Sequence, residues 1–345
     1  MANSKKKEFI DYFEKDKQGV HRIYAGQYLL LNDSTSIYKC AKGWIVLSPT
    51  PLLSGMGYRK ECLLKSYIYD TDNSDYSAKQ KQILKANNFI MPEIAKAFGL
   101  EAASYGRFKI VEDLDEGELA REENIAYIKD RKPVYRLKPN TEYVLTPSFL
   151  NNDEEFVPFG DLIKDDKEHN VNVIWENIEE SLISRNISKD NIKQIRKQYI
   201  LKTIFGAYAE LSDNHNYNDG IIFTDDRSNR AARIAPAYDL DYSMRVYNIG
   251  AYGQPITFIK EASSTHFEVI DMLKNFKDEL SEKEFDKLMC NLEPDEIAKI
   301  IYDVDKKHRL NLTFDVVQAY MKFFEEKYKE MESFYRVRYG KDIDD

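Results

Sequence analysis

A cluster of short polar side chains between residues 210 and 243 has the residue types and spacing needed to bind a metal ion and to activate a hydroxyl group. Asp213 and Asn218 are five positions apart, and Asp239 follows two short apolar segments. Carboxylate and amide oxygens are the hard ligands that Mg²⁺ prefers in proteins. An aspartate that does not bind the metal can orient or accept the proton of a hydroxyl group. The set therefore predicts Mg²⁺-assisted group transfer.

The elements predicted around this cluster bring its two ends together. Residues 188–211 have the apolar recurrence of a helix, which ends where the cluster begins. Residues 220–224 and 230–234 each read as a strand, and a polar turn joins them. Asn218 then lies at the entry of a hairpin and Asp239 just beyond its exit, so we expect the two side chains to lie side by side.

Phosphoryl transfer suits this arrangement because the protein contributes mainly positioning and charge neutralisation to that reaction. Kinase sites use an aspartate near the substrate hydroxyl, an asparagine five residues later that binds the metal, and a second aspartate after a hairpin. Asp213, Asn218 and Asp239 have these types in this order. Asp241 competes with Asp239, because either carboxylate can face the site. Taken singly these residues are common turn formers, and only their joint spacing favours a site.

The same passage resembles the HipA-like serine/threonine kinases, which include small single-chain bacterial members. Their catalytic loop has the form Asp-x-His-Asn-x-Asn, and the segment from Asp213 to Asn218 matches it. Their metal-binding aspartate ends a Pro-x-Tyr/Phe-Asp motif, and the four residues ending in Asp239 match that motif. The resemblance implies that Asp213 is the catalytic base and that Asn218 and Asp239 bind Mg²⁺. It also implies that His215 organises the catalytic loop, in which Asn216 is the other matching residue.

Residues 1–147 are predicted to form a β-rich N-terminal lobe over the nucleotide. Short apolar runs bounded by turn residues read as strands, and one longer segment reads as a helix that ends at Gly99. The strands are expected at residues 28–31, 44–47, 62–69, 134–137 and 143–146, and the helix at 77–100.

A kinase also needs a flexible loop over the phosphates and a lysine on the strand that follows it. Ser54, Gly55 and Gly57 form the short segment that offers two glycines ahead of a strand. Lys65 on that strand is the predicted phosphate-binding lysine, and Lys60 is the alternative.

Two further nucleotide contacts follow from position and from the resemblance. The segment that contains Thr146 and Phe149 is the expected hinge, whose backbone would contact adenine. The resemblance also predicts a glutamate in the preceding helix as the partner of the lysine. The aligned position holds Asn88, and Glu93 falls nearly two turns later, so either Glu93 takes that role or the ion pair is absent.

Residues 148–345 are predicted to form a mainly helical lobe that carries the catalytic loop and the metal site. Residues 147–160 are rich in Asn, Asp, Glu and Pro, which is typical of a hinge or linker. Ser281 and Glu284 have the spacing of a capping box at the start of a helix. Residues 314–335 carry apolar side chains at steps of three and four, which predicts a long helix packed against this lobe.

The composition excludes several classes of protein. No window approaches the ~18 apolar residues of a membrane span, so a cytoplasmic protein without membrane contact is expected. A net charge of −9 opposes direct nucleic-acid binding, which needs clustered Lys and Arg. Three cysteines without pairing pattern indicate neither a disulfide framework nor a zinc site.

The expected fold is therefore α+β, a two-lobed protein-kinase-like architecture with ATP and Mg²⁺ as cofactors. The expected activity is transfer of the γ-phosphoryl group to a Ser or Thr hydroxyl of a protein substrate. Related kinases act in toxin–antitoxin systems, so the resemblance allows an antitoxin partner. Two alternatives stand beside this reading: a catalytically silent nucleotide-binding scaffold, and an enzyme of the same fold that performs nucleotidyl transfer or phosphorylates a small molecule or lipid.

Overall fold

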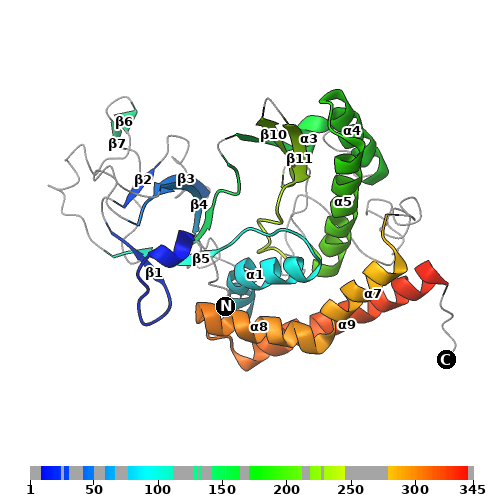
Figure 1. Cartoon of the computed structure of the whole chain (residues 1–345). Helices are drawn as coiled ribbons and strands as arrows, with labels where there is room; N and C mark the ends of the chain where they lie inside the picture. The colour runs from blue at the N-terminus through cyan, green and yellow to red at the C-terminus, as the bar shows by residue number, and fades with distance from the viewer. Residues whose placement is uncertain are drawn as a thin grey trace, which may run out of the picture. The chain divides into compact units, whose positions relative to one another are not determined.

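The computed structural model describes most of the chain, in two compact units (Figure 1). Unit 1 comprises Met1–Ser77, Ala103–Phe149 and Val304–Asn311, and unit 2 comprises Ala78–Ala102, Leu150–Asp303 and Leu312–Asp345. The described residues are 9–24, 27–30, 42–49, 59–66, 77–111, 128–129, 132–133, 142–151, 153–163, 171–211, 218–226, 229–244 and 279–340.

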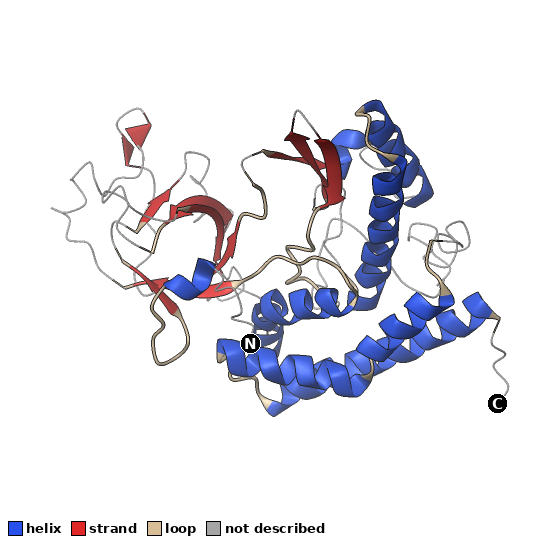
Figure 2. Cartoon of the chain, viewed as in Figure 1, coloured by secondary structure: helices blue, strands red, loops and turns tan. Residues whose placement is uncertain are grey.

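Unit 1 is built on a curled six-stranded sheet, drawn in red in Figure 2. The strand order is β1-β5-β8-β4-β3-β2, and every neighbouring pair is antiparallel except β1 and β5. The strands are β1 (His21–Ile23), β2 (Tyr28–Leu30), β3 (Lys42–Leu47), β4 (Lys60–Ser66), β5 (Gly106–Ile110) and β8 (Glu142–Pro147). A short 3-10 helix (Phe9–Tyr12) and the pair β6 (Ile128–Lys129) and β7 (Lys132–Pro133) complete the unit.

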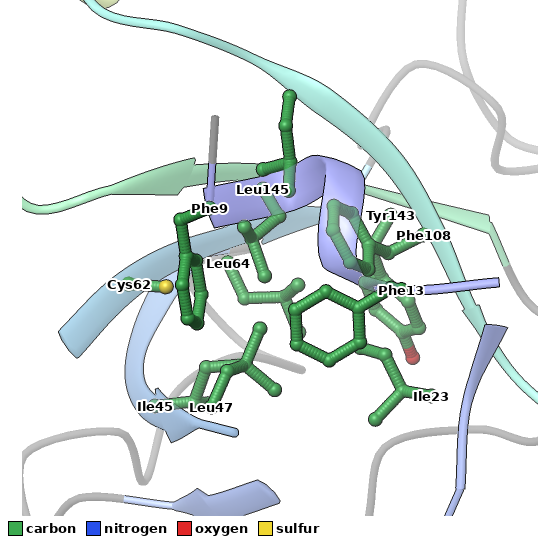
Figure 3. Close-up of a cluster of buried hydrophobic side chains, with 11 residues drawn as sticks. Phe9, Phe13, Ile23, Ile45, Leu47, Cys62, Leu64, Phe108, Tyr143 and Leu145 are labelled. Atoms are coloured by element: carbon green, nitrogen blue, oxygen red, sulfur yellow. The ribbon is translucent and has the colours of Figure 1, made fainter. Parts of the chain in front are cut away.

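One face of this sheet carries the hydrophobic core of unit 1 (Figure 3). Cys62 and Leu64 of β4 are fully buried there, and the rings of Phe13 and Phe108 meet edge to face with centroids 5.6 Å apart. Burial raises the pKa of the Cys62 thiol to about 12, so this cysteine is an apolar core residue rather than a reactive one. Because side chains alternate along a strand, Lys65 points to the face opposite this core.

Arg107 joins three separate parts of unit 1. Its guanidinium makes a two-point ion pair with Glu142, with Nε to Oε1 at 2.8 Å and Nη2 to Oε2 at 2.7 Å. Its Nη1 donates to the backbone oxygens of Gln18 (3.1 Å), His308 (2.7 Å) and Arg309 (2.9 Å). The last two are at the end of helix α8 (Pro294–His308), where carbonyl groups lack partners within the helix. One buried side chain therefore links two strands, a loop and a helix end.

His21 of β1 is a buried histidine that is held neutral. It is 3% exposed, and its ring stacks on Phe108 with centroids 4.8 Å apart. Burial, reinforced by the charge of Lys15, lowers the pKa of His21 from 6.5 to about 4. Between those two pH values the unfolded chain binds a proton that the folded chain does not, so folding becomes less favourable as the pH falls.

We therefore expect the free energy of unfolding of unit 1 to decrease by about 2 kcal/mol for His21 alone between pH 7 and pH 5. His308, whose pKa burial lowers to about 3, adds a change of the same sign. Urea titrations at pH 7 and pH 5 measure this difference, with hydrogen exchange of peptides from β5 as the signal for unfolding of unit 1. A His21→Phe variant keeps an aromatic ring but cannot titrate, and it should lose part of the pH dependence. An unchanged pH dependence in that variant would contradict the assignment.

Unit 2 is mainly helical and contains one small sheet. Its strands form an antiparallel sheet in the order β11-β10-β9. They are β9 (Glu154–Pro158), β10 (Gly220–Asp226) and β11 (Asn229–Ile234). The helices are α1 (Ala78–Ala97), α3 (Phe159–Leu162), α4 (Val171–Ser184), α5 (Lys189–Ala209), α7 (Glu282–Asn291), the first turns of α8, and α9 (Phe314–Tyr339). None of the described helices is both long enough and apolar enough to cross a membrane.

Local sequence signals account for several of these elements. The hydroxyl of Ser188 accepts a hydrogen bond from the Asn191 amide and starts α5, and the predicted capping box of Ser281 and Glu284 starts α7. The predicted ends of α1 and α9 are also close to those observed, with Gly99 in the left-handed region at φ 77°. The predicted strand at 134–137 lies outside the described residues.

The reading of residues 147–160 as a linker is wrong from Glu154 onward, whereas the boundary between the two units does fall in this range, at Phe149 and Leu150. This segment contains β9, which pairs with β10 through the register Phe156 to Ile222, and the start of α3. Its polar composition reflects a half-exposed edge strand rather than an irregular connection.

Candidate catalytic site

The predicted hairpin is confirmed, and it defines one end of the candidate site. β10 and β11 pair with Ile221 opposite Ile234, and the Ala235 amide donates to the Gly220 carbonyl at 2.9 Å. Asn218 precedes Gly220 by two positions, and Asp239 follows Ala235 by four. Both therefore belong to the open end of the same hairpin. Their side-by-side placement stays a prediction.

Lys202 of α5 connects the two segments of the chain that meet at this open end, the one before β10 and the one after β11. Its Nζ lies 2.6 Å from Asp219 Oδ1, 2.8 Å from the Ala235 oxygen and 3.4 Å from the Pro236 oxygen. Asp219 Oδ1 also accepts from the Gly220 amide at 2.7 Å. Burial raises the pKa of Asp219, and the Lys202 ammonium opposes that shift. Asp219 is therefore committed to this ion pair, which fixes the backbone beside Asn218.

Asp239 lies in a backbone conformation that few side chains adopt. Its φ is 57°, in the left-handed region, where aspartate is tolerated better than most residues. The chain is fixed on both sides of it: the Ala237 amide donates to the Glu101 oxygen at 2.8 Å, and Asn87 Nδ2 donates to the Asp241 oxygen at 2.9 Å. Strained conformations persist where the surroundings fix them, and they are frequent at functional sites.

Burial distinguishes the two candidate metal aspartates. Asp241 is fully buried, whereas Asp239 keeps part of its side chain accessible. An accessible carboxylate can reach a bound metal and its nucleotide, which favours Asp239 over Asp241. The amide oxygen of Asn218 and the carboxylate of Asp239 are hard donors, and this donor set fits Mg²⁺.

Asn87, to which the sequence analysis assigned no role, supports the segment that follows Asp239. Asn87 of α1 is fully buried, and its Nδ2 donates to the backbone oxygens of Asp241 (2.9 Å) and Ser243 (3.3 Å). Its Oδ1 accepts from the hydroxyl of Tyr320 on α9 at 2.7 Å. A polar residue at a core position of an apolar helix was the available signal, because buried amides need hydrogen-bond partners.

The end of α5 leads directly into the predicted catalytic loop. The Glu210 amide donates to the Ala207 oxygen (3.2 Å) and the Leu211 amide to the Gly206 oxygen (3.1 Å), which is the Schellman arrangement. Glu210 takes the left-handed position of that motif at φ 46°, where glycine is usual. Asp213, His215 and Asn216 follow outside the described residues, so their roles stay predictions.

The carboxylate of Glu210 forms a buried ion pair with α9. Lys327 Nζ lies 2.6 Å from Glu210 Oε1 and 2.6 Å from Glu330 Oε2, and the side chains of Lys327 and Glu210 are only 7% and 4% exposed. A glutamate at a helix C-terminus opposes the helix dipole, and a left-handed glutamate is strained. The charge of Lys327 offsets both of these free-energy costs, and it also offsets the cost of burying the Glu210 carboxylate.

The nucleotide-binding residues predicted in unit 1 lie on β4 and β8 where they are described. Lys65 is 6% exposed and lies opposite Val144 of β8, whereas Lys60 begins β4 on the side of the hydrophobic core. This alternation favours Lys65 as the phosphate-binding lysine. Thr146 is buried and lies opposite Leu63.

The remaining nucleotide-binding residues stay predictions. Phe149 is partly exposed, and the neighbouring Ser148 amide donates to the Glu61 oxygen at 2.8 Å, so that amide is engaged with β4. Ser54, Gly55 and Gly57 lie outside the described residues.

Neither candidate partner for the phosphate-binding lysine is a simple match. Asn88 is 1% exposed, and its Nδ2 donates to the Leu84 oxygen of its own helix at 3.0 Å. Glu93 lies 2.7 Å from Lys96, one turn along α1. Asn88 therefore has a structural role, and Glu93 is engaged on its own helix.

A cleft of 460 Å³ lies beside the Lys202 clamp, between α5, β11 and the turn after α1. The cations of its lining each meet a carboxylate: Lys202 pairs with Asp219, Lys197 with Glu284 and Arg233 with Glu154. Burial alone would raise the pKa of Glu154, but the hydrogen bonds and charge of Arg233 lower it. Arg233 also lies 3.1 Å from Glu101 of the lining, so these three cations meet four carboxylates around the cleft.

Comparison with known proteins identifies the fold. No protein family profile matches the sequence, and no curated protein matches it. Among solved structures, the proinflammatory kinase CtkA of Helicobacter pylori matches with a TM-score of 0.55 and 12% identity, over 92% of this chain and 98% of that one. HipA of Shewanella oneidensis MR-1, in a toxin–antitoxin complex with HipB and operator DNA, matches at 0.39 and 11%, over 90% of this chain and 66% of that one. At such identities the likeness shows the fold alone, and the predicted α+β kinase-like fold is confirmed.

Proposed function

We propose that this chain, which has the fold of a HipA-like kinase, is an ATP- and Mg²⁺-dependent phosphotransferase that acts on a Ser or Thr hydroxyl of a protein. The observation that carries the proposal is the fixed open end of the β10–β11 hairpin. It bears Asn218 on one side, and on the other side Asp239 in a strained conformation between two anchored residues. Residues held in such a conformation by their surroundings are frequent at functional sites.

The proposed roles follow the chemistry of phosphoryl transfer. The hydroxyl oxygen forms a bond to the γ-phosphorus of ATP, the bond from that phosphorus to the bridging oxygen breaks, and ADP leaves. Asp213 accepts the hydroxyl proton, with His215 and Asn216 in the same loop. Asn218 and Asp239 hold Mg²⁺, which when bound neutralises phosphate charge. Lys65 contacts the phosphates, with Lys60 as the alternative.

The other proposed contacts complete the nucleotide site. Ser54, Gly55 and Gly57 cover the phosphates, and the segment from Thr146 to Phe149 contacts the adenine. The proposal thus assigns the residues that cover the nucleotide to the predicted lobe of residues 1–147, and the catalytic loop and metal site to the predicted lobe of residues 148–345. The family resemblance supports a protein substrate and, as in related kinases, an antitoxin partner, and the absence of a long apolar run from the sequence supports a cytoplasmic location.

Purified protein incubated with γ-labelled ATP and Mg²⁺, with and without cell lysate, tests this function. Label should pass to protein in the wild type and be absent in an Asp213→Ala variant, because the base that accepts the hydroxyl proton is missing. Circular dichroism should show that both proteins are equally folded. Equal labelling by the two proteins would remove Asp213 from the site.

A catalytically silent nucleotide-binding scaffold is the second candidate. Asn88 favours it, because this residue occupies the position where the resemblance predicts a glutamate, and its amide bonds the Leu84 oxygen of its own helix at 3.0 Å. In this case ATP would raise the melting temperature without any transfer of label. AMP on the product instead of phosphate would indicate nucleotidyl transfer, and label on a small molecule or lipid would change the substrate class.

A further inference from the structure

Helix α9 presents two buried polar side chains to the elements around the candidate metal site. Tyr320 and Lys327 are both buried, in a helix whose outer face is charged. They are seven residues apart, which is two helical turns, so they lie on the same side of α9. Burial raises the pKa of Tyr320 well above 10, and its hydroxyl therefore remains a hydrogen-bond donor.

Tyr320 acts on the residues after Asp239 through one intermediate side chain. Its hydroxyl lies 2.7 Å from Asn87 Oδ1 and 3.2 Å from the Ile83 oxygen. The hydrogen bond to Oδ1 orients the Asn87 amide so that Nδ2 points at the backbone oxygens of Asp241 and Ser243. The donor positions of an amide group are fixed once its oxygen is engaged.

Lys327 acts on the same segment from its other end. Its ion pair with Glu210 holds the left-handed residue that ends α5. The carbonyl of Ala209, the residue before Glu210, accepts the amide of Met244 at 2.9 Å. The end of α5 is thus the anchor for the end of the segment that begins at Ala237.

We propose that α9 positions the metal-binding segment, residues 237–244, through Tyr320 and Lys327. Neither side chain is placed to contact substrate, so both are positioning residues rather than catalytic ones. The segment carries Asp239, whose strained backbone needs fixed neighbours on both sides. The meaning of this inference for catalysis rests on the proposed function, but the coupling of α9 to the segment does not.

Tyr320→Phe is the sharpest test, because it removes one hydroxyl and keeps the ring that packs in the core. Tyr339→Phe is the matched control: it lies on the same helix, and its hydroxyl donates to the Leu280 oxygen at 2.6 Å, away from the segment. Lys327→Met tests the second connection, with Lys299→Met as its exposed counterpart. Hydrogen exchange of peptides that cover residues 237–244 is measured without nucleotide, and Mn²⁺ affinity is measured in the presence of ATP.

Tyr320→Phe should speed exchange of the segment about tenfold and weaken Mn²⁺ binding by a similar factor, as expected for one lost buried hydrogen bond. Tyr339→Phe should change neither. Where phosphotransfer is measurable, the Mg²⁺ concentration for half-maximal rate should rise while ATP binding without metal stays the same.

Equal exchange of the segment in wild type and Tyr320→Phe would overturn the inference, even if Lys327→Met fails to fold. If exchange of the segment is faster in Tyr320→Phe but the wild type transfers no phosphate, the positioning role is supported. The proposed function is then rejected. Uniformly faster exchange throughout the protein would reduce Tyr320 to a general stabilising residue and also overturn the inference.

Discussion

Replacing Asp239 with asparagine is expected to lower the rate of phosphoryl transfer by about three orders of magnitude or more while the protein stays folded. Asparagine tolerates the left-handed backbone at φ 57° nearly as well as aspartate, so the substitution removes charge without adding strain. Of the two proposed metal ligands, Asn218 and residue 239, neither would then carry a negative charge. Initial rates at saturating ATP and Mg²⁺, with circular dichroism as a check of folding, measure the effect.

Asp241→Asn is the informative control for that experiment. Asp241 is fully buried and two residues away, so it tests whether any loss of charge in the segment has the same effect. We expect a smaller loss of rate than for Asp239→Asn. The opposite order would make Asp241 the metal ligand, and a rate above one tenth of wild type for Asp239→Asn would remove Asp239 from the site.

Replacing Arg107 with methionine should lower the free energy of unfolding of unit 1 by about 3 kcal/mol. Methionine retains the apolar stem but leaves the carboxylate of Glu142 and the carbonyls of Gln18, His308 and Arg309 without the guanidinium. Groups buried without partners account for most of the cost of breaking such an arrangement. Urea unfolding monitored by hydrogen exchange in β5 and β8 gives the value.

Arg336→Met provides the comparison for Arg107→Met. Arg336 also pairs with a glutamate, Glu332, at 3.3 Å, but both side chains are about 40% exposed on α9. An exposed ion pair of this kind contributes less than about 1 kcal/mol. If Arg107→Met and Arg336→Met lost the same free energy of unfolding, the contacts of Arg107 would contribute no more to stability than an exposed ion pair does.

The elements that the sequence predicted well are those with local signals. The helix at 188–211 begins at a serine cap and has a regular apolar stripe, and the hairpin that follows has two short apolar strands around a polar turn. Gly99 marked the end of the helix at 77–100 because the residue takes a positive φ there. Each of these features is specified within a few residues of chain.

The elements that the sequence did not reveal depend on distant partners. β9 is an edge strand whose polar residues are recognisable only beside β10, and β1 is a three-residue strand that is paired with β5. Glu210 ends α5 in the position where a glycine would have given the signal, so nothing local distinguishes it. Its importance comes from Lys327, more than a hundred residues later.

The candidate site shows the same division. Asn218 and Asp239 were predicted from their spacing around a hairpin, which is a local property. The residues that fix the chain around them, Lys202, Asn87 and Tyr320, come from three different helices. No periodicity or motif connects such positions, because their contact exists only after the helices have packed.

The use of α9 as a support has a consequence for synthesis of the protein. Asp239 and Tyr320 are 81 residues apart, so a ribosome that adds ~5–20 residues per second needs roughly four to sixteen seconds to produce Tyr320 after Asp239. Throughout that interval the segment with Asp239 emerges without the helix that holds it. The nascent chain therefore passes through a stage in which Asp239 is present but its supporting contacts from α9 are not, and under the proposed function the site can be assembled only after α9 has been made.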